Sequence, residues 1–207
     1  MAKYNDLTVG QMEAAINKMG GWENFQAFLR DEYTLTKVAK AVAAALLTMI
    51  GTVSIAATPT EFVTSEKFVV NTKASAKVKI SYVGDNFKTW FSDKVEAPFA
   101  GSELCYQKLA KNSRDLPIIE ELGGEEKAET TLTEMFALME RQGHGQEGAL
   151  LNNGWANIFY VRDVNALLRT VRVSWRNGSW GVPAFPIDRP NGWLADRQVF
   201  SRNSATV

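Results

Sequence analysis

Residues 156–185 read ANIFYVRDVNALLRTVRVSWRNGSWGVPAF, and this stretch decides the fold class. It contains three runs rich in strand-forming residues, separated by two turn signals. The runs are 156–162, 167–175 and 179–185, and the turns lie at 163–166 and 176–178. The second turn is the more specific, because Asn-Gly between alternating runs typically forms a two-residue hairpin turn. We therefore predict a three-stranded antiparallel β-meander near the C-terminus.

The middle run alternates apolar and polar side chains, which is typical of a strand with one buried face. The apolar positions are Val171, Val173 and Trp175, and the polar positions are Thr170, Arg172 and Ser174. We expect Val171 and Val173 to point into the core. Arg172 should point to solvent or to a ligand.

The last 57 residues carry an excess of positive charge, with seven arginines, no lysine and three aspartates, hence a net charge of +4. Arginines beside exposed aromatic rings can grip phosphate while the rings stack on bases or sugars. The candidate ligand-binding residues are Arg162, Arg172, Arg176, Tyr160, Trp180 and Trp193. The alternative is that the aromatic residues belong to the core and that the arginines only solubilise an open sheet face.

The preceding part of the chain predicts helices first and then a mixture of helices and strands. Residues 8–29 should form a helical hairpin, because Thr8 and Gln11 have the spacing of a capping box and Gly20-Gly21 separates two apolar faces. A packing hairpin is favoured over a DNA-binding one, since acidic residues surround its single arginine. Further expected elements are a helix at 36–50, strands at 52–58, 62–70, 77–83 and 104–109, a short helix carrying Phe87, Trp90 and Phe91, and a helix that begins after Thr131.

These elements predict an α+β fold with N-terminal helices, a mainly antiparallel sheet and the C-terminal three-stranded β-meander. We expect one domain over residues 1–207. Its parts are a helix-rich region (1–51), a mixed region (52–150) and the meander (151–207).

Residues 41–57 are the most hydrophobic stretch and bear on the compartment. The stretch is shorter than the ~20 residues that span a bilayer, and threonine, serine and glycine interrupt it. We interpret it as a buried helix followed by a strand, without a membrane span, in a cytoplasmic protein. The alternative is an N-extended signal, which would make the protein exported.

Residues 115–150 are acidic, with Glu120-Glu121 and Glu125-Glu126 as adjacent pairs. Such pairs could run acid–base hydrolysis or bind a hard cation. A solvated acidic face, or a complement to the basic C-terminal region, is the favoured explanation, because the run lacks the residue order of a calcium loop. His144 is the only histidine and Cys105 the only cysteine. We therefore assign no catalytic residue, metal or cofactor.

Four pieces of the chain carry a resemblance to other proteins. They are KVKISYVGDNFKTWF, ELGGEEKAETTLTEMFALMERQG, NNGWANIFYVRDVNALLRTVRVSW and QVFSRN. The chain resembles a group of short uncharacterised proteins from candidate-phyla (Patescibacteria) genomes, over most of its length. It departs from that group at residues 41–58, where those proteins are more polar. The resemblance implies no activity.

The sequence thus favours a non-enzymatic binding or interaction module that uses an aromatic- and arginine-bearing sheet face. The partner would be another protein or a phosphate-bearing ligand. The 23 basic and 23 acidic side chains cancel, so no overall field attracts nucleic acid. The alternative function is a carboxylate- or metal-dependent hydrolase centred on the acidic segment 115–150.

Overall fold

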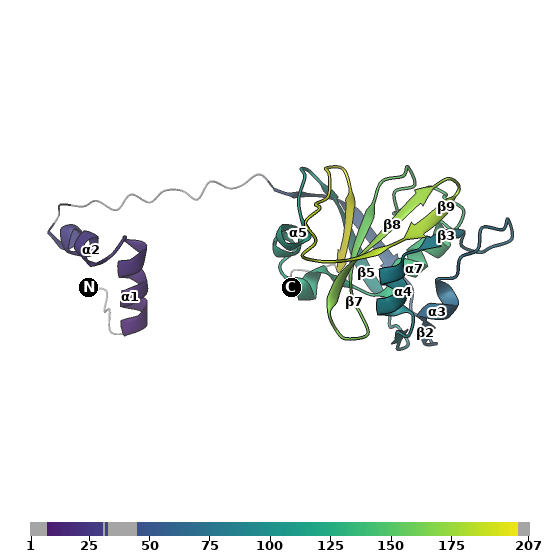
Figure 1. Ribbon diagram of the computed structural model, residues 1–207, viewed down its shortest axis with the longest axis horizontal. Coiled ribbons are helices and arrows are strands. Elements are labelled where there is room, and N and C mark those ends of the chain that lie inside the picture. The colour runs from purple at the N-terminus through teal and green to yellow at the C-terminus, as the bar shows by residue number, and fades with distance from the viewer. Residues whose placement is uncertain (1–7, 31, 33–44, 203–207) are drawn as a thin grey trace. The chain divides into compact units, whose positions relative to one another are not determined.

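The structure is a computed structural model that describes residues 8–30, 32 and 45–202 (Figure 1). Contacts between residues divide the chain into two compact units, Met1–Ala43 and Ala44–Val207, and each is described by itself. The prediction of a single domain over residues 1–207 stays a prediction.

The first unit is the expected helical hairpin, formed by α1 (Val9–Lys18) and α2 (Trp22–Leu29). The capping box is confirmed, because the Thr8 hydroxyl accepts from the Gln11 amide while the Gln11 side chain accepts from the Thr8 amide. No described residue of either helix is buried. The hairpin therefore contributes no enclosed core of its own.

Within residues 45–202, the second unit contains a nine-stranded sheet and a separate two-stranded one. The strands are β1 (Leu47–Ile55), β2 (Phe62–Val63), β3 (Ile80–Val83), β4 (Val95–Glu96), β5 (Ser102–Leu109), β6 (Glu129–Thr130), β7 (Asn157–Arg162), β8 (Leu168–Arg176), β9 (Ser179–Val182), β10 (Ala184–Pro186) and β11 (Gln198–Arg202). The helices are α3 (Thr64–Lys67), α4 (Asp85–Phe91), α5 (Asp115–Glu121), α6 (Glu125–Ala128) and α7 (Leu132–Arg141). The large sheet has the order β1-β5-β11-β7-β8-β9-β3, with β6 beside β7 and β10 beside β8. Most of its pairs are antiparallel, so the expected α+β class is confirmed.

The C-terminal meander is confirmed, because β7 pairs with β8 and β8 with β9, both antiparallel. Asn177 and Gly178 have φ of 52° and 80°, as a two-residue turn with two positive φ angles requires. The predicted third strand is interrupted at Pro183, which divides it into β9 and β10. Proline has no N–H to donate to the ladder, which accounts for the break.

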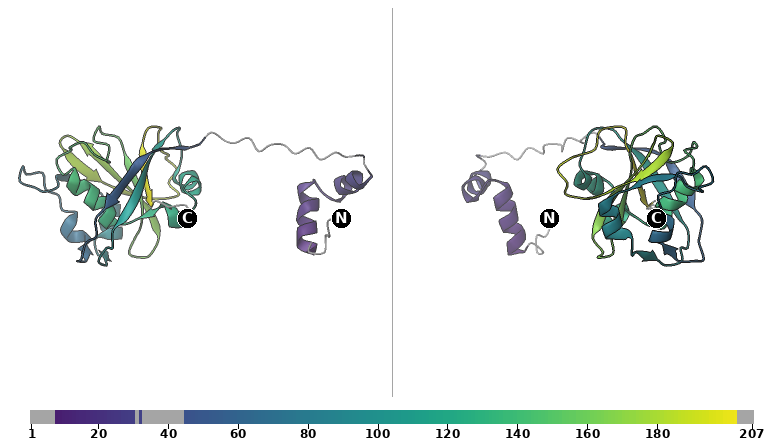
Figure 2. Two further views of the ribbon diagram at one scale, coloured as in Figure 1. Left: turned by 180° about the vertical axis from the view of Figure 1, so that it is seen from behind. Right: turned by 45° about the vertical axis from the view of Figure 1, so that its right-hand side comes forward.

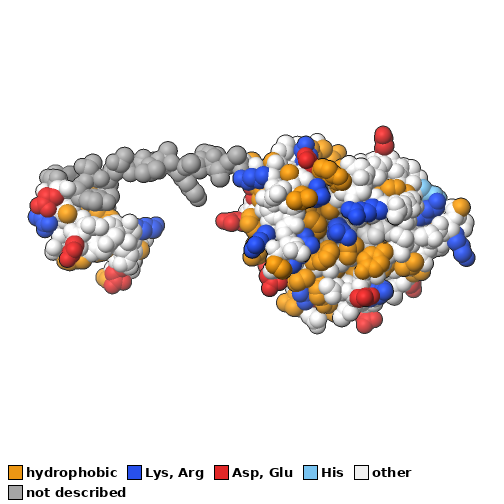
Figure 3. Space-filling model, turned by 45° about the horizontal axis from the view of Figure 1, so that its top comes forward, with side chains coloured by type: hydrophobic (Ala, Val, Ile, Leu, Met, Phe, Trp, Pro, Cys, Tyr) orange, Lys and Arg blue, Asp and Glu red, His pale blue; other side chains and the backbone are white. Residues whose placement is uncertain are grey.

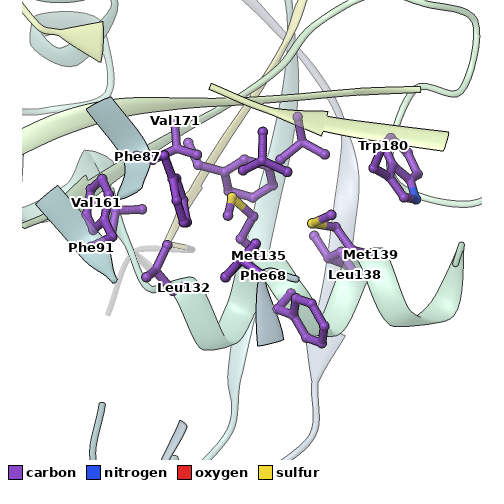
Figure 4. Close-up of a cluster of buried hydrophobic side chains, with 14 of the residues drawn as sticks. Phe68, Phe87, Phe91, Leu132, Met135, Leu138, Met139, Val161, Val171 and Trp180 are labelled. Carbon is purple, nitrogen blue, oxygen red and sulfur yellow. The ribbon is translucent and has the colours of Figure 1, made fainter. Parts of the chain in front are cut away.

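Helices cover the large sheet on both faces (Figures 1 and 2). On one face, α4 and α7 pack against residues that include Phe159, Val161 and Val171, as Figure 4 shows for Val161 and Val171. On the other face, α5 and α6 pack against Ile158 and Tyr160. The central strand β7 is consequently buried along almost its whole length.

The expected helix at 36–50 is wrong for its last four residues, because residues 47–50 belong to strand β1. Residues 36–44 of that prediction lie outside the described residues. Leu47–Ile55 is rich in threonine and β-branched residues, which favour strands over helices. The expected burial of residues 41–57 holds for Leu46, Leu47 and Ile55, but it is wrong for Met49 and Ile50, which are 51% and 50% exposed. The reason is that β1 is an edge strand, paired only with β5.

Three predicted elements are confirmed: the short helix with Phe87, Trp90 and Phe91 is α4, the strand at 104–109 is part of β5, and the helix after Thr131 is α7. Two other strand predictions need correction. Residues 62–70 form a strand only at Phe62–Val63, after which the chain enters α3. The strand at 77–83 begins only at Ile80. Alternation along a strand would place Tyr82 on the buried side with Ile80, but Tyr82 is 53% exposed. A register irregularity between Ile80 and Tyr82 breaks the alternation that the sequence suggests.

Candidate anion-binding site

Four arginine side chains line one cavity of about 220 Å³ in the second unit. The lining residues are Gly154, Trp155, Ala156, Arg172, Ser174, Arg176, Arg189, Gly192, Trp193, Leu194 and Arg197. No aspartate or glutamate is among these described residues. We call this cavity the arginine pocket. Figure 3 shows basic side chains next to hydrophobic ones on one face of this unit.

One wall of the arginine pocket is the polar side of β8. Arg172, Ser174 and Arg176 follow one another at every second position, opposite the fully buried Val171 and Val173. Alternation along the strand therefore sends these three polar side chains to one face of the sheet. The expectation for Val171 and Val173 is confirmed, and Arg172 is half-buried at the pocket rather than open to solvent.

The opposite wall is the segment 187–197, which connects β10 to β11 and supplies Arg189, Trp193 and Arg197. Its backbone is held by a pair of hydrogen bonds between Trp193 and Ser113, with N···O distances of 2.6 and 3.0 Å. At Gly192 an added Cβ would lie 2.6 Å from the carbonyl oxygen of Ser113. The segment can approach so closely only because this position is glycine.

Among the residues that the structure describes, no carboxylate forms an ion pair with Arg172. Its Nε atom is buried and has no hydrogen-bond partner among the described residues. Burial, followed by the positive charges of Arg176 and Arg189, lowers the pKa of Arg172 below its usual value. The pocket thus concentrates like charges that an incoming anion would neutralise.

Arg189 is flanked by aromatic rings. Its guanidinium carbon lies 3.9 Å from the ring centre of Trp193 and 4.5 Å from that of Phe185. Its Nε and Nη2 atoms are buried and have no hydrogen-bond partner among the described residues, and the same holds for Oδ2 of Asp115. Asp115 Oδ2 lies 3.6 Å from Nε, so the ion pair is longer than a hydrogen bond. Part of the donor capacity of Arg189 is therefore unused.

Asp115 lies behind the arginine pocket and is 1% exposed. Its Oδ1 atom accepts hydrogen bonds from Trp193 Nε1 at 2.7 Å and from the Tyr160 hydroxyl at 3.0 Å. Burial raises the pKa of Asp115, against the opposing effects of the Trp193 hydrogen bond and the charge of Arg189. Asp115 thus ties the connecting segment to the sheet.

The rim of the pocket carries an aromatic side chain. Trp155 is 37% exposed, and the guanidinium carbon of Arg197 lies 4.4 Å from its ring centre. Arg176 Nε donates to the carbonyl oxygen of Gly154 at 3.0 Å, which fixes the backbone beside this ring. A partly open indole surface therefore adjoins the four guanidinium groups.

Among the six predicted ligand-binding residues, the structure brings Arg172, Arg176 and Trp193 together in the arginine pocket. Arg162 lies elsewhere and forms hydrogen-bonded ion pairs with Glu125 at 3.0 Å and Glu129 at 2.9 Å.

Tyr160 and Trp180 cannot stack on a ligand in this structure, because both are fully buried. Tyr160 lies in the α5–α6 core, and Trp180 lies in the opposite core, where its Nε1 donates to the Gln142 carbonyl oxygen. The prediction of an exposed aromatic sheet face is wrong for these two residues, since helices cover both faces of the sheet. It is also wrong for Trp193, which lines the pocket but is only 6% exposed, with Arg189 against its ring.

The residues predicted from the sequence did not include four members of this region, which are Arg189, Arg197, Trp155 and Asp115. Arg189, Trp193 and Arg197 occur together in the ten residues DRPNGWLADR, 188–197, and that density of arginine around tryptophan is a usable signal. Asp115 gives no such signal, because it approaches Trp193 only through the fold.

Several carboxylates of the acidic segment 115–150 are engaged in structural contacts. Glu121 accepts from the amides of Leu46 and Leu47, at the start of β1, and Glu134 caps α7 and accepts from Ser102. Within the described ranges, no group of three or more histidine, cysteine, aspartate or glutamate residues could hold a metal ion. His144 is exposed, and its Nε2 lies 2.8 Å from the Ala76 carbonyl oxygen.

Over the part of the chain that the structure describes, no helix is both long and apolar enough to cross a membrane. Comparison of the chain with protein-family models, curated proteins and solved structures finds no match, so the resemblance to the Patescibacteria group stays a prediction.

Proposed function

We propose that the protein is a binding module that holds a phosphate-bearing ligand in the arginine pocket. One observation carries this proposal: four guanidinium groups line one cavity, and the Nε atom of Arg172 and the Nε and Nη2 atoms of Arg189 are buried without a hydrogen-bond partner. Buried donors are normally satisfied, because each unpaired one costs free energy. An anion seated in the pocket would offset the positive charges of the four guanidinium groups that line it.

Phosphate fits this lining better than a neutral ligand does. A guanidinium group presents a planar fork of donors that matches phosphate oxygens and remains charged at physiological pH. The aromatic rings beside Arg189 leave its positive charge in place while they displace water. Among the described lining residues, Ser174 carries the one hydroxyl and there is no histidine or carboxylate to act as a base. The lining therefore favours binding over hydrolysis.

The proposal is tested by titrating the full chain with inorganic phosphate and with pyrophosphate in a calorimeter at low salt. We expect binding to the wild type, and a loss of about tenfold or more in Arg172→Met, because a hydrogen bond to a charged group contributes about 1.5–3 kcal/mol.

Arg202→Met is the matched control, since Arg202 is exposed on β11 and does not line the pocket. It should bind both anions as the wild type does. The absence of binding in the wild type, or equal losses in the two variants, would refute the proposal.

A further inference from the structure

We propose, resting on the function above, that the ligand carries two adjacent phosphoryl groups and a flat ring, as a nucleoside diphosphate does. The two phosphoryl groups would occupy the arginine pocket, and the ring would stack on Trp155 at its rim. Charge, volume and the position of the indole each point to this class of ligand.

The charge of the site exceeds that of one phosphate ester. Arg172, Arg176, Arg189 and Arg197 line the cavity. Over the described ranges, only one carboxylate, that of Asp115, forms an ion pair with any of them. A phosphodiester carries one negative charge, and a phosphomonoester carries at most about two. A second phosphoryl group adds to that charge and supplies acceptors for donors on both walls of the pocket.

The volume of the pocket separates the anionic part of the ligand from the rest. At about 220 Å³, the cavity is smaller than the roughly 300–1,000 Å³ of sites that enclose a whole drug-sized ligand. The cavity therefore suits the compact anionic part of such a ligand, and the organic part must lie at the rim.

Trp155 is the feature of the rim suited to that organic part. Its ring is partly open to solvent while Arg197 lies against it. Arg176 connects the anionic and aromatic parts of the site, because it lines the pocket and also holds the Gly154 carbonyl oxygen next to Trp155. Stacking of a base on an aromatic side chain strengthens binding by about 5- to 150-fold.

A single-stranded nucleic acid fits these observations less well. Proteins that bind such strands spread their positive charge along a groove that follows the backbone. Here four arginines are concentrated around one cavity, and the whole chain has no net charge. The arrangement suits a compact polyanion better than an extended one.

The test is a calorimetric series on the full chain without divalent cations. It uses orthophosphate, pyrophosphate, adenosine 5′-diphosphate, uridine 5′-diphosphate, adenosine and a 5′-phosphorylated oligothymidylate. We expect pyrophosphate to bind more tightly than orthophosphate, and both nucleoside diphosphates to bind more tightly than pyrophosphate. Trp155→Ala should weaken both nucleoside diphosphates by about 5- to 150-fold more than it weakens pyrophosphate, since Trp155 also supports Arg197, whereas Trp155→Phe should retain most of the affinity.

The outcomes separate this inference from the function on which it rests. If pyrophosphate binds but the nucleoside diphosphates bind no more tightly, the inference fails and the anion-binding function stands. If no anion binds, both fail. Tighter binding of the oligothymidylate than of either nucleoside diphosphate would overturn the inference in favour of a nucleic acid. The wild-type series decides these points even if Trp155→Ala does not fold.

Discussion

Replacing Asp115, by alanine and separately by asparagine, tests whether this buried carboxylate holds the wall of the arginine pocket. Its Oδ1 atom accepts from Trp193 Nε1 and from the Tyr160 hydroxyl, in an environment where water cannot take its place. Alanine would leave both donors without a partner. Asparagine would keep an oxygen that can accept from both, while removing the charge.

The expected magnitudes follow from these two hydrogen bonds. Each buried donor left unsatisfied costs about 1–3 kcal/mol, so Asp115→Ala should lower the free energy of unfolding by about 2–6 kcal/mol. Asp115→Asn should lower it by no more than about 2 kcal/mol, because it loses only the part of each hydrogen bond that depends on charge. Asp188→Ala, at an exposed position beside Arg189, is the control and should stay within about 0.5 kcal/mol of the wild type.

The pH dependence of the unfolding free energy tests the role of Asp115 independently, because its direction depends on the pKa of this carboxyl group. Burial raises the pKa of Asp115 above its ordinary value of 3.8, so the folded chain holds this proton over a pH range in which the unfolded chain has lost it. The contribution of Asp115 to stability therefore falls as the pH rises from about 3.8 to the raised pKa, and is constant above it. The difference in unfolding free energy, wild type minus Asp115→Asn, should fall over the same range.

The free energy of unfolding of the wild type and of the three variants is measured by urea denaturation, followed by tryptophan fluorescence at constant salt between about pH 4 and pH 7. Equal losses of stability in the alanine and asparagine variants would refute the role of the hydrogen bonds. A difference that rises with pH would show that Arg189 and the hydrogen bonds, and not burial, dominate the pKa of Asp115.

Two further substitutions and one labelling experiment test the sheet and its turns. Val173→Ala removes two methyl groups from a fully buried position and should lower the free energy of unfolding by about 1–3 kcal/mol in urea; an unchanged value would contradict the register of β8. Burial alone would raise the pKa of Asp163, but the Arg169 guanidinium and two backbone amides outweigh it and lower that pKa. Asp163→Asn should therefore cost about 1–3 kcal/mol at neutral pH, and the loss should shrink as the pH falls below 3.8, a trend that urea unfolding at several pH values would confirm or contradict. Burial also raises the pKa of the Cys105 thiol, so a thiol reagent should label the native chain far more slowly than the urea-unfolded chain; equal rates would contradict its burial.

The local features of the sheet were predictable because each depends on a few neighbouring residues. The turn at Asn177-Gly178 needs two positive φ angles, and this pair of residue types adopts them readily. The capping box between Thr131 and Glu134 likewise closes within one helical turn. The alternation around Val173 identified the buried side of β8, because strand geometry alone sends neighbouring side chains to opposite faces.

Strand β1 shows what such reasoning cannot supply. Residues 47–50 follow an alanine-rich stretch, which favours a helix locally. They form a strand because Leu47 is registered against Leu109, more than sixty residues later, and because Glu121 accepts from the first amides of the strand. Both partners are distant in sequence, so no local pattern around residues 47–50 reveals them.

One wall of the arginine pocket was predictable from the sequence, because it depends on neighbouring residues of β8. The other wall was not, because it comes from a segment that only the fold brings there. The alternation along β8 places Arg172 and Arg176 on one face, but it cannot say whether that face meets water or another segment. The connection between β10 and β11 decides the matter, because β10 pairs with β8 whereas β11 pairs with β5 and β7. The chain must therefore pass over this face of the sheet, and it brings Arg189 and Arg197 with it. An open basic face would bind anions weakly through screened charges, whereas a face closed over by a second set of arginines can exclude water and direct its donors inward.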